Sequence, residues 1–196
     1  MLIDWARDER GAEIKGNPAR HLRVRGTGDA RAPFFTDKDE KRLLYELSKM
    51  SNKNHLRLTK LALTTGFRRS ELLSLTWRNI DLKKRVIYIH RKNCAAIDDS
   101  SVLRLVPLPE KAEKILEESN ERNGKVIELS KGAARNGFDK ARKRAGLQTL
   151  RFHDLRHIAI SRMWSSGMNA LEISACSGHR DIKMLMRYSH YELSLL

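Results

Sequence analysis

Two histidines, two arginines and an aspartate lie within the seven residues RFHDLRH, positions 151–157. If this stretch is helical, His153, Arg156 and His157 are spaced i, i+3 and i+4 and share one face. Such a face could serve a metal, a carboxylate or a phosphate. A metal is disfavoured, because a guanidinium beside a divalent cation is electrostatically costly and no nearby Cys or Glu offers a third ligand. Taken alone, the segment is also consistent with an ordinary polar helix start.

Other segments carry side chains of the same chemistry. Arg68 stands at the head of a predicted helix, Lys92 follows an apolar run, and Tyr188 lies nine residues after His179. Each has an ordinary structural explanation by itself, but together they suit a phosphodiester. Guanidinium forks bind non-bridging oxygens, and imidazoles bind the same group or move protons. A lysine can protonate a leaving alkoxide, and a tyrosine hydroxyl can attack and hold a covalent intermediate.

The charge balance points to a polyanionic partner. The 196 residues include 39 Lys and Arg against 24 Asp and Glu, a net charge of +15. This favours nucleic acid, although a basic structural or ribosomal protein would explain the charge equally well. No apolar run is long enough for a membrane span, and the first residues are too charged for a signal peptide. We therefore expect no membrane partner and a cytoplasmic location.

Apolar residues at helical spacing must position these side chains. They predict helices within 34–50, 55–66, 68–77, 111–122, 133–147, 153–167, 169–179 and 180–196. Thr36 and Asn169 are typical N-caps, and Gly66 and Gly167 are typical helix ends. Two runs rich in β-branched residues, 86–94 and 102–109, flank a polar turn and predict a hairpin. The expected fold is mainly α with a small antiparallel β-sheet, an α+β class.

Four stretches of the chain resemble, in set and order, the motifs of the tyrosine recombinase (phage integrase) family. They are TTGFRRSELLSLTWRNIDL, RKNCAAIDDSSVLRLVPLP, AGLQTLRFHDLRHIAISRMWSSG and SGHRDIKMLMRYSH, and they fall within 33–191. The resemblance implies a catalytic domain over 33–196. It implies that residues 1–32 are the remnant of the last helix of a core-binding domain together with a basic linker. The rest of the family's N-terminal DNA-clamping domain has no counterpart here, so we expect an N-terminally truncated protein.

The resemblance also assigns roles to the reactive residues. It implies a catalytic set of Arg68, Lys92, His153, Arg156, His179 and Tyr188, supported by Glu71 and His157. Tyr188 is the expected nucleophile, and Arg69 is expected to point away from the site. For Lys92 the match is weaker, because an arginine precedes it where the family often has threonine. No metal and no cofactor are expected.

The implied activity is site-specific recombination of double-stranded DNA through a 3′-phosphotyrosyl intermediate. A full-length protein would assemble into a tetramer on DNA, whereas this chain alone is expected to be monomeric. Two alternatives remain open at this point. A type IB topoisomerase shares the chemistry but reseals the same strand, and a DNA-binding regulator could keep the fold without cutting.

Overall fold

The computed structural model describes residues 35–90, 103–119, 122–179 and 181–186, all within one compact unit, 32–196. Its helices are α2 (Asp37–Ser48), α3 (Asn54–Thr65), α4 (Arg69–Ser74), α5 (Glu110–Glu117), α6 (Lys131–Arg144), α7 (Asp154–Ser165), α8 (Ala170–Ser177) and α9 (Lys183–Met186). Its strands are β1 (Ile80–Asp81), β2 (Val86–His90) and β3 (Leu103–Pro107). The predicted class, mainly α with a small antiparallel sheet, is confirmed. In the described part of the chain, no helix is both long and apolar enough to cross a membrane.

Local sequence explains where several helices begin and end. Thr36 caps α2, because its Oγ1 accepts from the backbone N of Asp39 at 3.2 Å while the Asp39 carboxylate accepts from the Thr36 backbone at 2.9 Å. Asn169 caps α8 in the same way. Gly66 ends α3 with φ at +65°, and Gly178 ends α8 with φ at +72°, a backbone region that favours glycine. The predicted caps at Thr36 and Asn169 and the helix end at Gly66 are confirmed.

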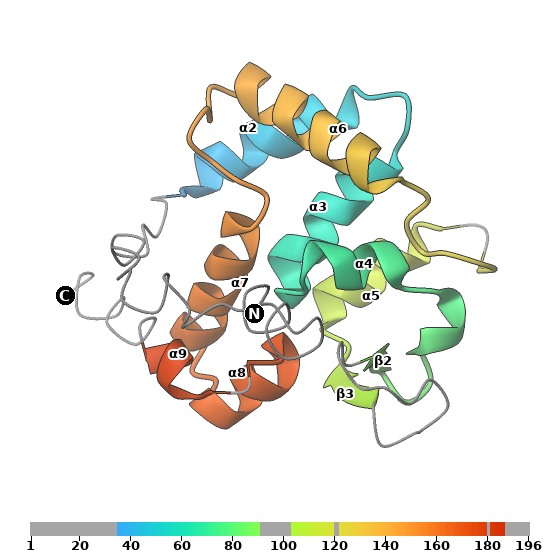
Figure 1. The fold of residues 1–196 in the computed structure, drawn as a ribbon, viewed down its shortest axis with the longest axis vertical. Coiled ribbons are helices and arrows are strands. Elements are labelled where there is room, and N and C mark those ends of the chain that lie inside the picture. Colours follow the sequence, from blue (N-terminus) through green and yellow to red (C-terminus); the bar gives the residue numbers. More distant parts are fainter. Residues whose placement is uncertain (1–34, 91–102, 120–121, 180, 187–196) are drawn as a thin grey trace, which may run out of the picture. The chain divides into compact units, whose positions relative to one another are not determined.

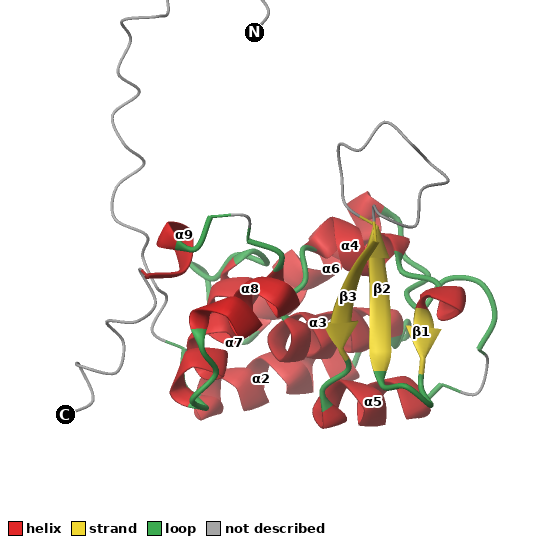
Figure 2. Ribbon diagram, turned by 90° about the horizontal axis from the view of Figure 1, so that it is seen from below, coloured by secondary structure: helices red, strands yellow, loops and turns green. Residues whose placement is uncertain are grey.

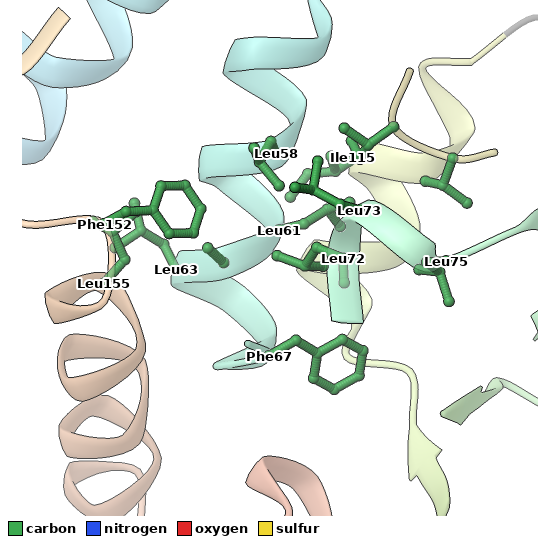
Figure 3. Packing of buried hydrophobic residues seen from close by; sticks show 14 of the residues in the cluster. Leu58, Leu61, Leu63, Phe67, Leu72, Leu73, Leu75, Ile115, Phe152 and Leu155 are labelled. Atoms are coloured by element: carbon green, nitrogen blue, oxygen red, sulfur yellow. The ribbon is translucent and has the colours of Figure 1, made fainter. Parts of the chain in front are cut away.

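The core is arranged around α3, which packs against α2, α4, α5, α6 and α7. Figure 1 shows α2 and α6 crossing one end of α3, with α7 and α4 nearer its other end. The close-up in Figure 3 shows apolar side chains of α4, α5 and α7 beside those of α3, including Leu58, Leu61, Leu63, Leu72, Leu73, Ile115 and Leu155. Full burial of such a side chain contributes about 1.5–3 kcal/mol. This core fixes the ends of α3 and α7, where the reactive residues lie.

The sheet has the order β1-β2-β3, and Figure 2 shows its strands side by side at one edge of the helices. The predicted hairpin is confirmed, with Ile87 paired to Val106 and Ile89 paired to Arg104. All four of these side chains are buried, whereas the intervening Leu105 is 57% exposed. Arg104 is therefore a charged residue on the inward face of the sheet.

One strand and several helix boundaries differ from the sequence predictions. The two residues of β1 pair with β2, but they are too few to produce an alternating pattern. The helix predicted over 68–77 ends at Ser74, because Leu75 is extended and its carbonyl accepts from the backbone N of Val126 at 3.0 Å. The helix predicted over 111–122 ends at Glu117.

Candidate active site

The start of α7 places the two histidines of RFHDLRH together. The carboxylate of Asp154, the first residue of α7, accepts from the backbone N of Arg151 at 2.7 Å and so fixes the turn that leads into the helix. His153 precedes the first helical residue, and His157 follows one turn later. Their ring centres are 4.9 Å apart in an edge-to-face arrangement. The shared face predicted for these two histidines is thus present at the first turn of α7.

Arg156, on the same turn, is only 3% exposed. Its Nη1 donates to the carbonyl of Gly66, at the end of α3, over 2.6 Å. Its Nη2 lies 3.4 Å from both ring nitrogens of His179, which follows α8. One guanidinium on α7 therefore contacts two other segments that are far from it in the sequence.

His179 is held by two serines of α8. The hydroxyl of Ser177 donates to the carbonyl of Ile173 at 2.6 Å, so towards Nδ1 of His179, 2.7 Å away, it can only accept. This favours the tautomer with the proton on Nδ1 and leaves Nε2 as the acceptor. The hydroxyl of Ser174 donates to the His179 carbonyl at 2.8 Å and fixes its backbone.

Arg68 is held by Glu71, which the sequence assigned as its support. The Glu71 carboxylate accepts from the Arg68 backbone at 2.8 Å, which caps α4, and from its Nη1 at 3.1 Å. Nη2 of Arg68 donates to the carbonyl of Gly178 at 3.4 Å. Because the Arg68 side chain is still 43% exposed, its guanidinium remains accessible to a ligand.

Arg104 extends this network and was missed by the sequence analysis. It is 8% exposed, and its Nη2 lies 3.6 Å from Glu71, so one carboxylate serves two guanidinium groups. The Arg104 guanidinium also occupies the space that a side chain at Gly178 would fill, and it lies 5.5 Å from the ring centre of Phe67. A charged residue at an inward position of a strand was the sequence signal that could have identified it.

The environment of His153 favours its neutral form. Burial lowers the pKa of His153 below its usual value, and the positive charges of Arg156 and Arg68 lower it further against an opposing effect of Asp154. A neutral imidazole at physiological pH can accept a proton. His153 and Arg156 also line one cavity.

The structure thus brings together four of the six predicted catalytic residues, namely Arg68, His153, Arg156 and His179. Lys92 and Tyr188 lie outside the described residues. Arg69, which was expected to point away from the site, lies over the ring of Phe152 at 5.8 Å from its centre and lines the same cavity as His153 and Arg156. Within the described ranges, no group of three or more His, Cys, Asp or Glu side chains is arranged to hold a metal ion. Two guanidiniums and two imidazoles at one place are suited to bind a phosphate.

Comparison with known proteins bears on this arrangement. Residues 33–193 match the Phage integrase family. The chain belongs to the phage integrase family. Over 195 residues it is 34% identical to a shufflon-specific DNA recombinase of Escherichia coli, covering 96% of this chain and 48% of that protein. The chain spans about half or less of the length of the curated relatives it matches.

Solved structures of similar proteins confirm the family's catalytic-domain fold. The catalytic domain of bacteriophage HP1 integrase matches with a TM-score of 0.63 at 25% identity, covering 81% of this chain and 87% of that one. A Tn1549 transposon integrase in complex with transposon right end DNA matches with a TM-score of 0.64 at 19% identity, covering 93% and 72%. The second likeness concerns the fold alone.

The contact between Arg104 and Gly178 yields a test of how the site is held. Gly178→Ala should lower the free energy of unfolding by about 2–5 kcal/mol, because a left-handed alanine costs about 1–2 kcal/mol and displacement of the Arg104 guanidinium adds about 1–3 kcal/mol. Gly124→Ala is the matched control, since Gly124 has a similar φ of +68° and open space around it. Urea unfolding of both variants measures the difference. Equal losses would show that Arg104 does not occupy this space.

Proposed function

We propose that this chain is the catalytic part of a site-specific DNA recombinase that cleaves and rejoins DNA through a 3′-phosphotyrosyl intermediate. The observation that carries the proposal is the convergence of Arg68, His153, Arg156 and His179 from three separate parts of the chain. Membership of the phage integrase family supports the same reading. Together they favour chemistry on a single phosphodiester.

In this proposal the arginines and His179 bind the scissile phosphate. The forks of Arg68 and Arg156 hold its non-bridging oxygens. His179, whose Nδ1 proton is directed at Ser177, takes up a second proton at Nε2 and donates from it to the same group. Charge on these oxygens rises in the transition state, and donors fixed in advance stabilise it without reorganisation. The buried hydrogen bond of Arg156 to Gly66 provides that fixed geometry.

The remaining steps are substitution at phosphorus and the proton transfers that accompany it. The Tyr188 hydroxyl attacks the phosphate while neutral His153 accepts its proton. The bond from phosphorus to the 5′ oxygen breaks, and Lys92 protonates the departing oxygen. A 3′-phosphotyrosyl bond then holds the strand, and a 5′ hydroxyl from a second DNA attacks it to complete exchange. One ester replaces another at each step, so neither ATP nor a metal is needed.

The proposed partner is double-stranded DNA, bound through its phosphates by a chain with a net charge of +15. We further propose that residues 1–32 are the end of a DNA-clamping domain and its linker, and that the protein is associated with the bacterial or phage nucleoid. Tetramer formation on DNA is proposed for the longer proteins of the family. This chain by itself is proposed to be monomeric and to bind DNA weakly, at about 10⁻⁴–10⁻⁶ M near physiological salt.

The nucleophile provides the most direct functional test. Tyr188→Phe removes one oxygen, so it should abolish covalent protein–DNA adducts on a nicked duplex while DNA binding persists. Tyr191→Phe is the matched control, because it makes the same change three residues later and should leave adducts intact. Denaturing gels measure the adducts. Adducts that survive in Tyr188→Phe but disappear in Tyr191→Phe would show that Tyr191 is the nucleophile. Relaxation of supercoiled DNA by the unaltered chain without recombinant products would favour a topoisomerase.

The proposed acid can be tested through the leaving group. Lys92→Ala should slow cleavage by about 10²–10⁴-fold on ordinary DNA, because general acid catalysis contributes that much. When sulfur replaces the 5′ bridging oxygen, the leaving group departs as a thiolate and needs no proton. The variant should therefore recover most of its cleavage rate on this substrate. Cleavage rates on both substrates decide the matter, with Arg91→Ala as the neighbouring control. An equal defect on both substrates would exclude Lys92 as the acid.

A further inference from the structure

A cavity of about 400 Å³ lies directly beside the proposed phosphate site and is not explained by it. His153 and Arg156 line one wall, so the cavity and the catalytic cluster share two residues. Buried aromatic rings, Phe67, Phe138 and Phe152, form another part of its lining. The cavity therefore has a firm apolar base next to reactive polar groups.

The polar lining of this cavity is strongly positive. Besides Arg156 it includes four further arginines, Arg69, Arg135, Arg142 and Arg151, against a single carboxylate, Asp139. None of these four belongs to the predicted catalytic set. A concave site with five guanidiniums and one carboxylate attracts an anion, because low-dielectric walls concentrate the field of the charges.

Asp139 is already committed to two of these arginines. Its carboxylate accepts from Nε of Arg142 at 2.7 Å and lies 3.9 Å from Nε of Arg135. Hydrogen bonding from Arg142 lowers the pKa of Asp139, which keeps this carboxylate ionised. Among the residues that the structure describes, Arg69 and Arg151 form no ion pair with any carboxylate. An anion entering the cavity would therefore meet positive charge that the protein does not neutralise.

Part of this lining is also held in place before any ligand arrives. The guanidinium of Arg142 contacts the carbonyl of Gln148 as well as Asp139. Arg69 stacks over the Phe152 ring, which itself packs edge-to-face against Phe138 at 5.1 Å between ring centres. Arginines held by such contacts lose less entropy on binding a planar or tetrahedral oxyanion than free surface arginines do.

We propose that this arginine pocket, led by Arg69 and Arg151, binds the backbone phosphate that neighbours the scissile phosphate on the same DNA strand. The inference rests on the proposed function, which places the scissile phosphate against Arg156. Successive phosphates of one strand advance only about 3.4 Å along the axis of B-DNA, so the next phosphate must lie in an adjoining site. Because the pocket shares His153 and Arg156 with the catalytic cluster, we take the pocket to be this adjoining site. It sets the register of the strand and so aligns the correct phosphodiester with the catalytic cluster.

A double-mutant cycle between protein and DNA tests this assignment. Duplexes carry one methylphosphonate, which removes the charge of a single phosphate, at each position around the nick in turn. Arg151→Gln should weaken binding to the all-phosphate duplex about 10-fold and lower the slope of log affinity against log salt by about 0.9. When the methylphosphonate is at the neighbouring position, Arg151→Gln should cause little further loss. Arg69→Gln should behave in the same way, with fluorescence anisotropy as the measurement.

Arg144→Gln is the matched control, because Arg144 is an exposed arginine of the same helix, α6, as Arg142 and does not line the pocket. It should reduce affinity equally at every methylphosphonate position. Uniform losses for Arg151→Gln and Arg69→Gln as well, or coupling only at a distant phosphate, would overturn the pocket assignment. Covalent adduct formation by the unaltered chain is scored separately. Adducts without coupling would refute the pocket alone, whereas coupling without adducts would refute the proposed recombinase chemistry alone.

Discussion

Arg156 carries its positive charge in the interior, between α3, α7 and the turn after α8. A buried guanidinium is stable only where hydrogen bonds replace the water it has lost. Gly66 supplies one such bond, since a carbonyl at the end of a helix lacks an intrahelical partner. The same bond fixes the end of α3 to the first turn of α7. His179 completes the contact from the turn after α8, so the packing of three helices and the geometry of the proposed phosphate site depend on one side chain.

The second organising group is the carboxylate of Glu71. It caps α4, holds the guanidinium of Arg68 and pairs with Arg104 from the inward face of β3. Arg104 in turn fills the space beside Gly178, whose carbonyl accepts from Arg68. The small sheet is thereby connected to the site through Arg104. Rigid support of this kind is what a transition state that gathers charge requires.

Much of this arrangement could be predicted from local sequence. Caps such as Thr36 and helix ends such as Gly66 are set by chemistry within a few residues, and the hairpin by two apolar runs around a turn. The spacing of His153 and His157 predicted their shared face. The strand β1 could not be predicted because two residues are too few to show an alternating pattern. The partners of Arg104 and the arginine pocket could not be predicted because they depend on packing between distant segments. Arg156 and Gly66, for example, are 90 residues apart in the sequence.

We propose that Arg68, Arg156 and His179 form a binding site for one phosphate, with their side chains in position before the phosphate binds. A crystal structure of the Tyr188→Phe chain on a nicked duplex measures this most directly. We predict non-bridging oxygens of the scissile phosphate at about 2.7–3.2 Å from the guanidinium nitrogens of both arginines and from Nε2 of His179, with the bond from Arg156 to Gly66 unchanged. A scissile phosphate bound away from these three side chains, or an Arg156 that has left Gly66 to reach it, would contradict the account.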